Sequence, residues 1–259
     1  MKNKTEKRSP LKEKPLRHAG QSIDDAIDDK SINAFTWFLY PGILFSFVLD
    51  AWLRYLYPRP ATSPWFLTIL TIIISVLATV KIINLAKEIG RLRMARDGEK
   101  LVGEGLQELL KQGATVFHDV QGEKFNIDHV VVSQHGIFLI ETKTYSKPIK
   151  KEAVITHDKS NVYVDGFPVE RNPIDQVNAL SRWLQELLQK STGIKFYIKP
   201  VILFPGWYTE KVKGGEETWI LNPKALPTFI ENEPIRLKET DVHLVAFHLS
   251  RYIKTYEIK

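Results

Sequence analysis

The 259-residue chain contains no cysteine, which excludes a disulfide framework and any thiolate metal site. It also has no glycine-rich phosphate-binding loop, and its Ser, His and Asp residues occur in no recognisable context for nucleophilic catalysis. No internal repeat is visible. The lack of cysteine fits a reducing compartment.

Basic residues are concentrated beside the apolar segments of the chain. The formal net charge is +6, and residues 1–20 carry seven Lys or Arg against two Glu. Residues 86–96 carry four more basic residues against one Glu, so residues 97–259 are close to neutral. Because a domain that binds nucleic acid typically carries a basic face of its own, this distribution argues against broad, nonspecific DNA affinity.

Two stretches near the N-terminus are long, apolar and free of charge. Residues 31–49 form one stretch of nineteen residues, and residues 60–80 form another of twenty-one. At a helical rise of ~1.5 Å per residue, each can cross a hydrocarbon core roughly 30 Å thick. We therefore predict a transmembrane helical hairpin over residues 31–85, with spans at about 31–50 and 60–82 and a kink at Pro41-Gly42. The bilayer is thus a predicted partner.

Lys and Arg predict the orientation of this hairpin. Both outer flanks are basic, whereas the connecting turn has only Arg54 and Arg59. The positive-inside rule then places both termini in the cytoplasm of a multi-pass inner-membrane protein. The alternative is a pair of buried helices in a soluble domain, which needs a very large core. A cleavable signal peptide is disfavoured because the first apolar run begins late and lacks a small-residue cleavage site.

The flanking segments complete the predicted organisation. Residues 1–30 have few apolar residues and many Lys, Asp and Pro, which predicts a disordered basic and acidic tail. Its acidic block at residues 24–29 is interpreted as a solvated start of the membrane helix. Residues 86–96 form a basic juxtamembrane linker or helix, and residues 97–259 form one globular domain.

Helical and β-type patterns alternate along the globular domain. Apolar spacing predicts helices over residues 85–112, 173–190 and 241–252. Short β-type runs predict strands over residues 114–120, 126–133, 136–143, 154–156, 162–164, 196–204 and 219–221. This order predicts an α/β domain whose mixed central β-sheet is flanked by helices.

Asp128, Glu141 and Lys143 stand out at the ends of two strongly apolar strands. Glu141 and Lys143 point to the same face because side chains alternate along a strand, and pairing of the strands brings Asp128 close to Glu141. The two carboxylates would hold Mg²⁺ or Mn²⁺ through oxygen ligands, and Lys143 would neutralise charge on a phosphate. The alternative is a salt bridge on a solvated strand.

The order of motifs resembles the nuclease-related domain (NERD) family, a branch of the PD-(D/E)XK nuclease superfamily. The resemblance covers roughly residues 95–225. It is carried by Asp97–Glu99, Phe125–Val132, Gly136–Lys143, Asn172–Gln176 and Phe204–Trp207. It implies a restriction-endonuclease-like fold over residues 97–259.

The resemblance also assigns residues to roles. Asp128, Glu141 and Lys143 match the family's catalytic set, with Asp128 and Glu141 as the metal ligands. Gln176 matches a polar position that orients substrate or water, and Glu99 matches a glutamate of the first helix. An ordinary helix-cap or surface residue is the alternative for Gln176, and an exposed helix residue is the alternative for Glu99.

Several neighbouring residues stay open at this point. Glu104 competes with Glu99, His129 points away from Asp128 and is interpreted as structural, and His118 and Asp119 have no assigned role. The basic run of Lys143, Lys147, Lys150 and Lys151 could contact phosphates, although such a run is more often a solvated loop.

The sequence thus predicts a membrane-tethered, Mg²⁺- or Mn²⁺-dependent phosphodiesterase that acts on DNA or RNA at the cytoplasmic face. Two other hypotheses stay open: a catalytically silent nuclease-like module that binds nucleic acid or protein, and a scaffold whose hairpin forms a homo-oligomer.

Overall fold

The computed structural model describes residues 16–57, 63–147, 154–158, 160–211 and 217–256. The chain divides into two compact units. Residues 22–97 form a helical unit, and residues 98–259 form a second unit together with the segment that ends at Gln21.

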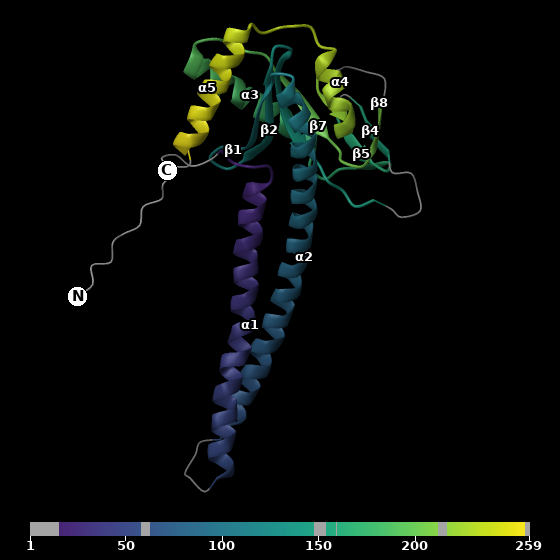
Figure 1. The fold of residues 1–259 in the computed structure, drawn as a ribbon. Helices are drawn as coiled ribbons and strands as arrows, with labels where there is room; N and C mark the ends of the chain where they lie inside the picture. The colour runs from purple at the N-terminus through teal and green to yellow at the C-terminus, as the bar shows by residue number, and fades with distance from the viewer. Residues whose placement is uncertain (1–15, 58–62, 148–153, 159, 212–216, 257–259) are drawn as a thin grey trace, which may run out of the picture. The chain divides into compact units, whose positions relative to one another are not determined.

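The helical unit consists of two long antiparallel helices, α1 (Gln21–Leu56) and α2 (Trp65–Lys111), which lie side by side (Figure 1). The indole Nε1 of Trp52 donates a hydrogen bond to Oγ1 of Thr68 over 3.0 Å, and Lys30 forms an ion pair with Glu88. The first contact joins the helices beside the loop that connects them, and the second joins them towards the opposite end of the hairpin. The segment is therefore a helical hairpin. Helix α1 continues through Pro41 without a break.

Both helices carry an apolar surface that the described residues leave uncovered. Each is long and apolar enough to cross a membrane, and only 6% of the most apolar window of α1 and 11% of that of α2 is buried. The core helix of a soluble protein is mostly buried instead. Hydroxyl groups in the apolar part of α2 bond back to helical carbonyls, as Ser75 does to Thr71 over 2.7 Å, which leaves few polar groups exposed on this surface.

The predicted tail needs one correction. Residues 1–15 lie outside the described part, but α1 already begins at Gln21, so residues 21–30 are helical and not disordered. Asp24 lies in the first turn, where a carboxylate is stabilised by the helix dipole, and it pairs with Arg96 over 3.4 Å. Ile27 is buried. Residues 86–96 are an uninterrupted part of α2.

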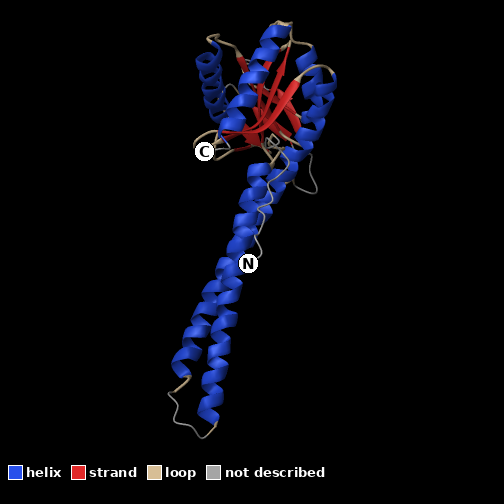
Figure 2. Cartoon of the chain, turned by 60° about the vertical axis from the view of Figure 1, so that its left-hand side comes forward, coloured by secondary structure: helices blue, strands red, loops and turns tan. Residues whose placement is uncertain are grey.

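A five-stranded mixed sheet forms the centre of the second unit (Figure 2). Its strands run in the order β1-β2-β3-β7-β9: β1 (Thr115–Gln121), β2 (Asn126–Ser133), β3 (Gly136–Thr142), β7 (Ile198–Leu203) and β9 (Trp219–Leu221). The first three pair antiparallel, whereas β3, β7 and β9 are parallel. Strands β2 and β3 are almost wholly buried, which explains their nearly continuous apolar sequences.

Helices cover both faces of this sheet. Helices α3 (Pro173–Thr192) and α5 (Glu239–Tyr256) pack on the face formed by Val130, Val132, Ile137 and Leu139. The part of α2 from Gly98 onward and the short α4 (Leu226–Glu231) pack on the face formed by Val131, Phe138 and Ile140. The predicted mixed α/β class, with two long apolar helices before a sheet flanked by helices, is confirmed.

The shorter strands form a separate four-stranded sheet, which the sequence did not predict. Its order is β6-β5-β4-β8: β6 (Phe167–Pro168), β5 (Val162–Val164), β4 (Val154–His157) and β8 (Tyr208–Lys211). Strands β6 and β8, helix α4 and the 3-10 helix Pro223–Ala225 were also not predicted. Runs of two to six residues show too little periodicity to identify their partners.

Candidate functional site

Glu141, Lys143 and Gln176 form a closed set of hydrogen bonds at the end of β3. Nζ of Lys143 donates to Oε1 of Glu141 over 2.8 Å and to Oε1 of Gln176 over 2.9 Å. Nε2 of Gln176 donates to the same Glu141 oxygen over 2.7 Å. Glu141 Oε1 therefore accepts two hydrogen bonds, and the second carboxylate oxygen is left for another partner.

The start of α3 positions Gln176. The side chain of Asn172 accepts a hydrogen bond from the backbone N–H of Ile174 over 3.1 Å and caps the helix, and Pro173 occupies its first turn. Gln176 follows in the first turns of this capped helix at an exposed position, from which its side chain reaches Glu141. The cap therefore brings Gln176 to Glu141 across 35 positions of sequence.

Asp128 lies beside Glu141 because β2 and β3 pair in the predicted way. His129 pairs with Ile140, so Asp128 and Glu141 occupy the next positions along the two strands. Oδ2 of Asp128 accepts a hydrogen bond from the backbone N–H of Thr142 over 2.7 Å. Both carboxylates are buried.

Glu99 approaches from α2. A Cβ atom on Gly98 would clash with Oγ1 of Thr144, so glycine lets the helix come this close to the end of β3. Glu99 is buried, and its carboxylate accepts a hydrogen bond from the backbone N–H of Gly20. Glu104, the competing residue, is exposed. The structure thus places Glu99, and not Glu104, with Asp128 and Glu141.

Burial and mutual repulsion favour the neutral forms of these carboxyl groups. Burial, then Asp119 and Glu141, raises the pKa of Glu99 to about 8. Burial, then Glu141 and Glu99, raises the pKa of Asp128 well above its usual range. Burial also raises the pKa of Glu141, although Lys143 and Gln176 oppose the shift. The cluster therefore needs protons or added positive charge near neutral pH.

The donor set fits a divalent cation held by carboxylate oxygens. Oε2 of Glu99 and Oε2 of Glu141 are buried, and in the described part of the chain neither accepts a hydrogen bond. Hard cations take oxygen ligands of this kind. Among the described residues, no group of three or more His, Asp or Glu side chains could hold a metal ion, so a cation would rest on two carboxylates, and water or substrate would complete its coordination.

Asp119 is a buried carboxylate near this cluster for which the sequence predicted no role. It adopts a left-handed φ of 49°, and β1 and β2 pair on both sides of it. Nε of Arg17 donates to its Oδ2 over 2.6 Å, and Nδ2 of Asn126 donates to its Oδ1 over 3.0 Å. The side chains of Arg17 and Asp119 are 9% and 0% exposed, so this is a buried ion pair. No local signal reveals it, because 102 positions separate the partners.

His118 and His129 contact each other away from the hydrogen-bonded set. Their Nδ1 atoms lie 2.8 Å apart, so one ring donates and the other accepts. Burial, with a smaller contribution from His118, lowers the pKa of His129 to about 3. A neutral, buried ring agrees with the structural interpretation of His129. Of the predicted basic run, Lys150 and Lys151 lie outside the described residues.

We predict that Arg17→Ala destabilises the folded chain by about 3–5 kcal/mol, because it leaves the carboxylate of Asp119 buried without its guanidinium partner. The apparent melting temperature of the full chain in detergent micelles measures the effect. Combining Arg17→Ala with Asp119→Asn should recover part of the loss. Arg91→Ala, at an exposed position of α2, is the control. Equal melting temperatures for Arg17→Ala and Arg91→Ala would contradict a stabilising ion pair.

A second prediction concerns pH. Because folding raises the pKa of Glu99 from 4.5 to about 8, the folded chain binds more protons than the unfolded chain between these values, and stability falls as pH rises. The loss from this group between these two pH values is on the order of 5 kcal/mol. Melting temperatures measured with EDTA across this range should decline less for Glu99→Gln than for the wild type; parallel curves would refute the shift.

Comparison of the sequence with known proteins shows which family this part of the chain is similar to. Residues 95–205 match the model of a family described as nuclease-related domain, NERD. The match ends before the expected limit near residue 225. Searches of the curated proteins and of the solved structures found no match. The match contains Glu99, Asp128, Glu141, Lys143 and Gln176 but not Arg17. Residues 95–205, most of which lie in the second unit, are therefore similar to a nuclease-related domain.

Proposed function

We propose that the chain is a membrane-tethered phosphodiesterase that hydrolyses DNA or RNA with the help of Mg²⁺ or Mn²⁺. The observation that carries this proposal is the joining of Asp128 and Glu141 with Lys143 and Gln176 inside a nuclease-related domain. In hydrolysis, water adds to phosphorus, the phosphorus–oxygen bond to the leaving group breaks, and one proton passes to the leaving oxygen.

Each residue of the set has a distinct task in this proposal. Asp128 and Glu141 would hold the cation, which supplies positive charge to the phosphate and acidifies water. Lys143 already donates to Glu141 and Gln176, and its third N–H can donate to a phosphoryl oxygen. Gln176 keeps Glu141 and Lys143 in place. Glu99, with one unpartnered oxygen, would ionise and strengthen cation binding as pH rises towards 8.

The proposal also places the domain at the cytoplasmic face of the inner membrane. The two apolar helices are its support, since each could span a bilayer. Lys and Arg lie before α1 and after the apolar part of α2, which by the positive-inside rule favours cytoplasmic termini and a multi-pass topology.

A second candidate function is binding without catalysis. The near-neutral charge of residues 97–259 and the absence of a group of three metal-ligating side chains among the described residues favour it. Metal-independent binding of a strand, with no cutting in Mg²⁺ or Mn²⁺, would support this candidate.

The catalytic proposal predicts that the full chain in lipid nanodiscs cuts labelled DNA or RNA when Mg²⁺ or Mn²⁺ is added. Asp128→Asn and Lys143→Ala should each lower the rate by roughly a hundredfold or more, because each removes a group that binds or neutralises charge at the phosphate. Lys190→Ala, at an exposed position of α3, is the control. Unchanged cutting by both site variants would show that the assignment is wrong.

The membrane proposal predicts a different defect for Ile73→Arg. This residue is half exposed within the apolar part of α2, and a central Arg costs roughly 2.5–3.5 kcal/mol of insertion free energy. The measurement is the fraction of chain that stays with vesicles after an alkaline wash. Leu101→Arg changes an exposed leucine outside the predicted spans and should have no effect; if the wild type is also washed off, the helices do not anchor the chain.

A further inference from the structure

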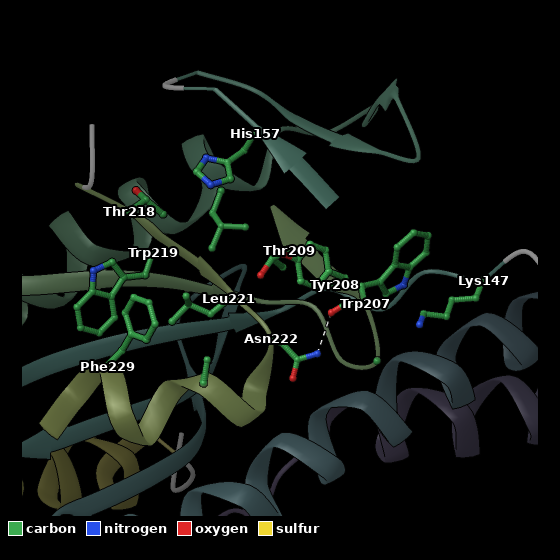
Figure 3. Close-up of a pocket in the computed structure, with 13 residues that line it drawn as sticks. Lys147, His157, Trp207, Tyr208, Thr209, Thr218, Trp219, Leu221, Asn222 and Phe229 are labelled. Atoms are coloured by element: carbon green, nitrogen blue, oxygen red, sulfur yellow. Dashed lines mark hydrogen bonds between the residues drawn. The ribbon is translucent and has the colours of Figure 1, made fainter. Parts of the chain in front are cut away.

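A pocket of about 580 Å³ lies among β4, β8, β9 and α4 (Figure 3). Trp219 and Phe229 lie at one end, Trp207 and Lys147 lie at the other, and His157 lies on a third side. This volume is within the range of sites that enclose a small molecule or cofactor. Nothing in the proposed hydrolysis uses this pocket.

Hydrogen bonds and ring contacts hold its walls. Trp207 is 1% exposed, and its Nε1 donates to the backbone carbonyl of Tyr145 over 3.2 Å. The side chain of Asn222 donates to the carbonyl of Trp207 over 2.8 Å. Trp219 stacks on Phe138 and meets the edge of Phe229. The pocket is therefore formed before any ligand arrives.

Two aromatic rings on its wall are open to a ligand. Tyr208 is 68% exposed and Phe229 is 38% exposed. The Trp219 ring is less accessible, because Phe138 stacks on it and Nζ of Lys199 lies 4.8 Å from its centre. Tyr208 and Phe229 are thus the surfaces on which a flat ring can stack.

The charged and polar residues of the lining restrict the class of ligand that the pocket can bind. The described lining residues include Lys147, whose Nζ lies 5.8 Å from the centre of the Trp207 ring, and no carboxylate. Thr209, Thr218 and His157 add polar atoms to a mostly apolar wall. A flat ring with a polar edge and a nearby negative charge fits this mixture of apolar, polar and basic lining residues.

The pocket is connected to the carboxylate cluster by a short segment. Lys143 contacts Glu141, Tyr145 accepts the hydrogen bond from Trp207, and Lys147 lies on the pocket wall. Four residues span at most ~14 Å, so the two lysines lie within a few nucleotides of each other along a strand.

We propose that this pocket binds unpaired nucleobases of a strand whose phosphate lies at the carboxylate cluster. One base stacks on Tyr208 and another on Phe229, and Lys147 attracts a neighbouring phosphate. A paired base must leave the duplex stack before it can enter such a pocket. The substrate class is therefore single-stranded nucleic acid. This inference rests on the proposed function for the position of the phosphate.

The test measures binding by the full chain in nanodiscs with EDTA, so that metal-dependent cutting cannot interfere. Fluorescein-labelled oligo(dT) should bind more tightly than the same strand annealed to oligo(dA). Tyr208→Ala and Phe229→Ala should each weaken binding of the single strand about five- to a hundredfold, as loss of a stacking ring does. Tyr208→Phe and Phe229→Tyr, which keep the rings, should restore it.

Two controls make the result specific. Phe247→Ala removes an exposed ring from α5 and should change nothing. An abasic strand, which has the phosphates but no bases, should bind equally to the wild type and to both alanine variants. Wild-type affinity of both alanine variants for oligo(dT), or equal losses for the abasic strand, would overturn the pocket assignment.

Cutting with Mn²⁺ separates this inference from the proposed function. If the wild type cuts and both ring variants cut and bind as it does, the catalytic proposal stands and the pocket assignment fails. If nothing is cut but binding of oligo(dT) depends on Tyr208 and Phe229, the pocket assignment stands and the catalytic proposal fails.

Discussion

The crowding of carboxyl groups at the end of the five-stranded sheet is the constraint on which the site depends. Register places Asp128 beside Glu141, and Gly98 lets Glu99 approach from α2. Burial raises the pKa of all three groups, and for Glu99 and Asp128 neighbouring carboxylates add to the shift. Such a group of anions persists near neutral pH only with bound protons or nearby cations. Lys143 supplies one positive charge, which is why its contact with Glu141 organises the set.

The centre of the fold and most of the site could be predicted from sequence because their signals are local. Strands β2 and β3 are continuous apolar runs bounded by turn residues, and the turn between them determines their register. That register brings Asp128 to Glu141, and alternation along the chain puts Glu141 and Lys143 on one face. The resemblance to the nuclease-related domain added Gln176 and Glu99, whose distant helices no periodicity could have connected to β3.

The rest depends on contacts that have no local signal. Arg17 and Asp119 form their ion pair across 102 positions, and Arg17 lies outside the matched domain. The strands of the second sheet are too short to identify their neighbours, so β4 and β5 seemed to belong to the central sheet, and β8 was missed. The first ten residues of α1 are mostly polar, and they are helical because a longer helix, an ion pair and the buried Ile27 support them.

The distribution of charge links the two apolar helices to the way in which the domain would recognise a strand in the proposed function. Most of the excess positive charge flanks the apolar helices, where it favours an anionic membrane surface. A nearly neutral domain attracts a polyanion such as nucleic acid only weakly at long range, because the electrostatic attraction depends on the charge of the protein surface that the polyanion approaches. Affinity must then come from short-range contacts. In the proposed function Lys143 and Lys147 would meet phosphates, and Tyr208 and Phe229 would stack on bases, so that local contacts would replace a broad basic face.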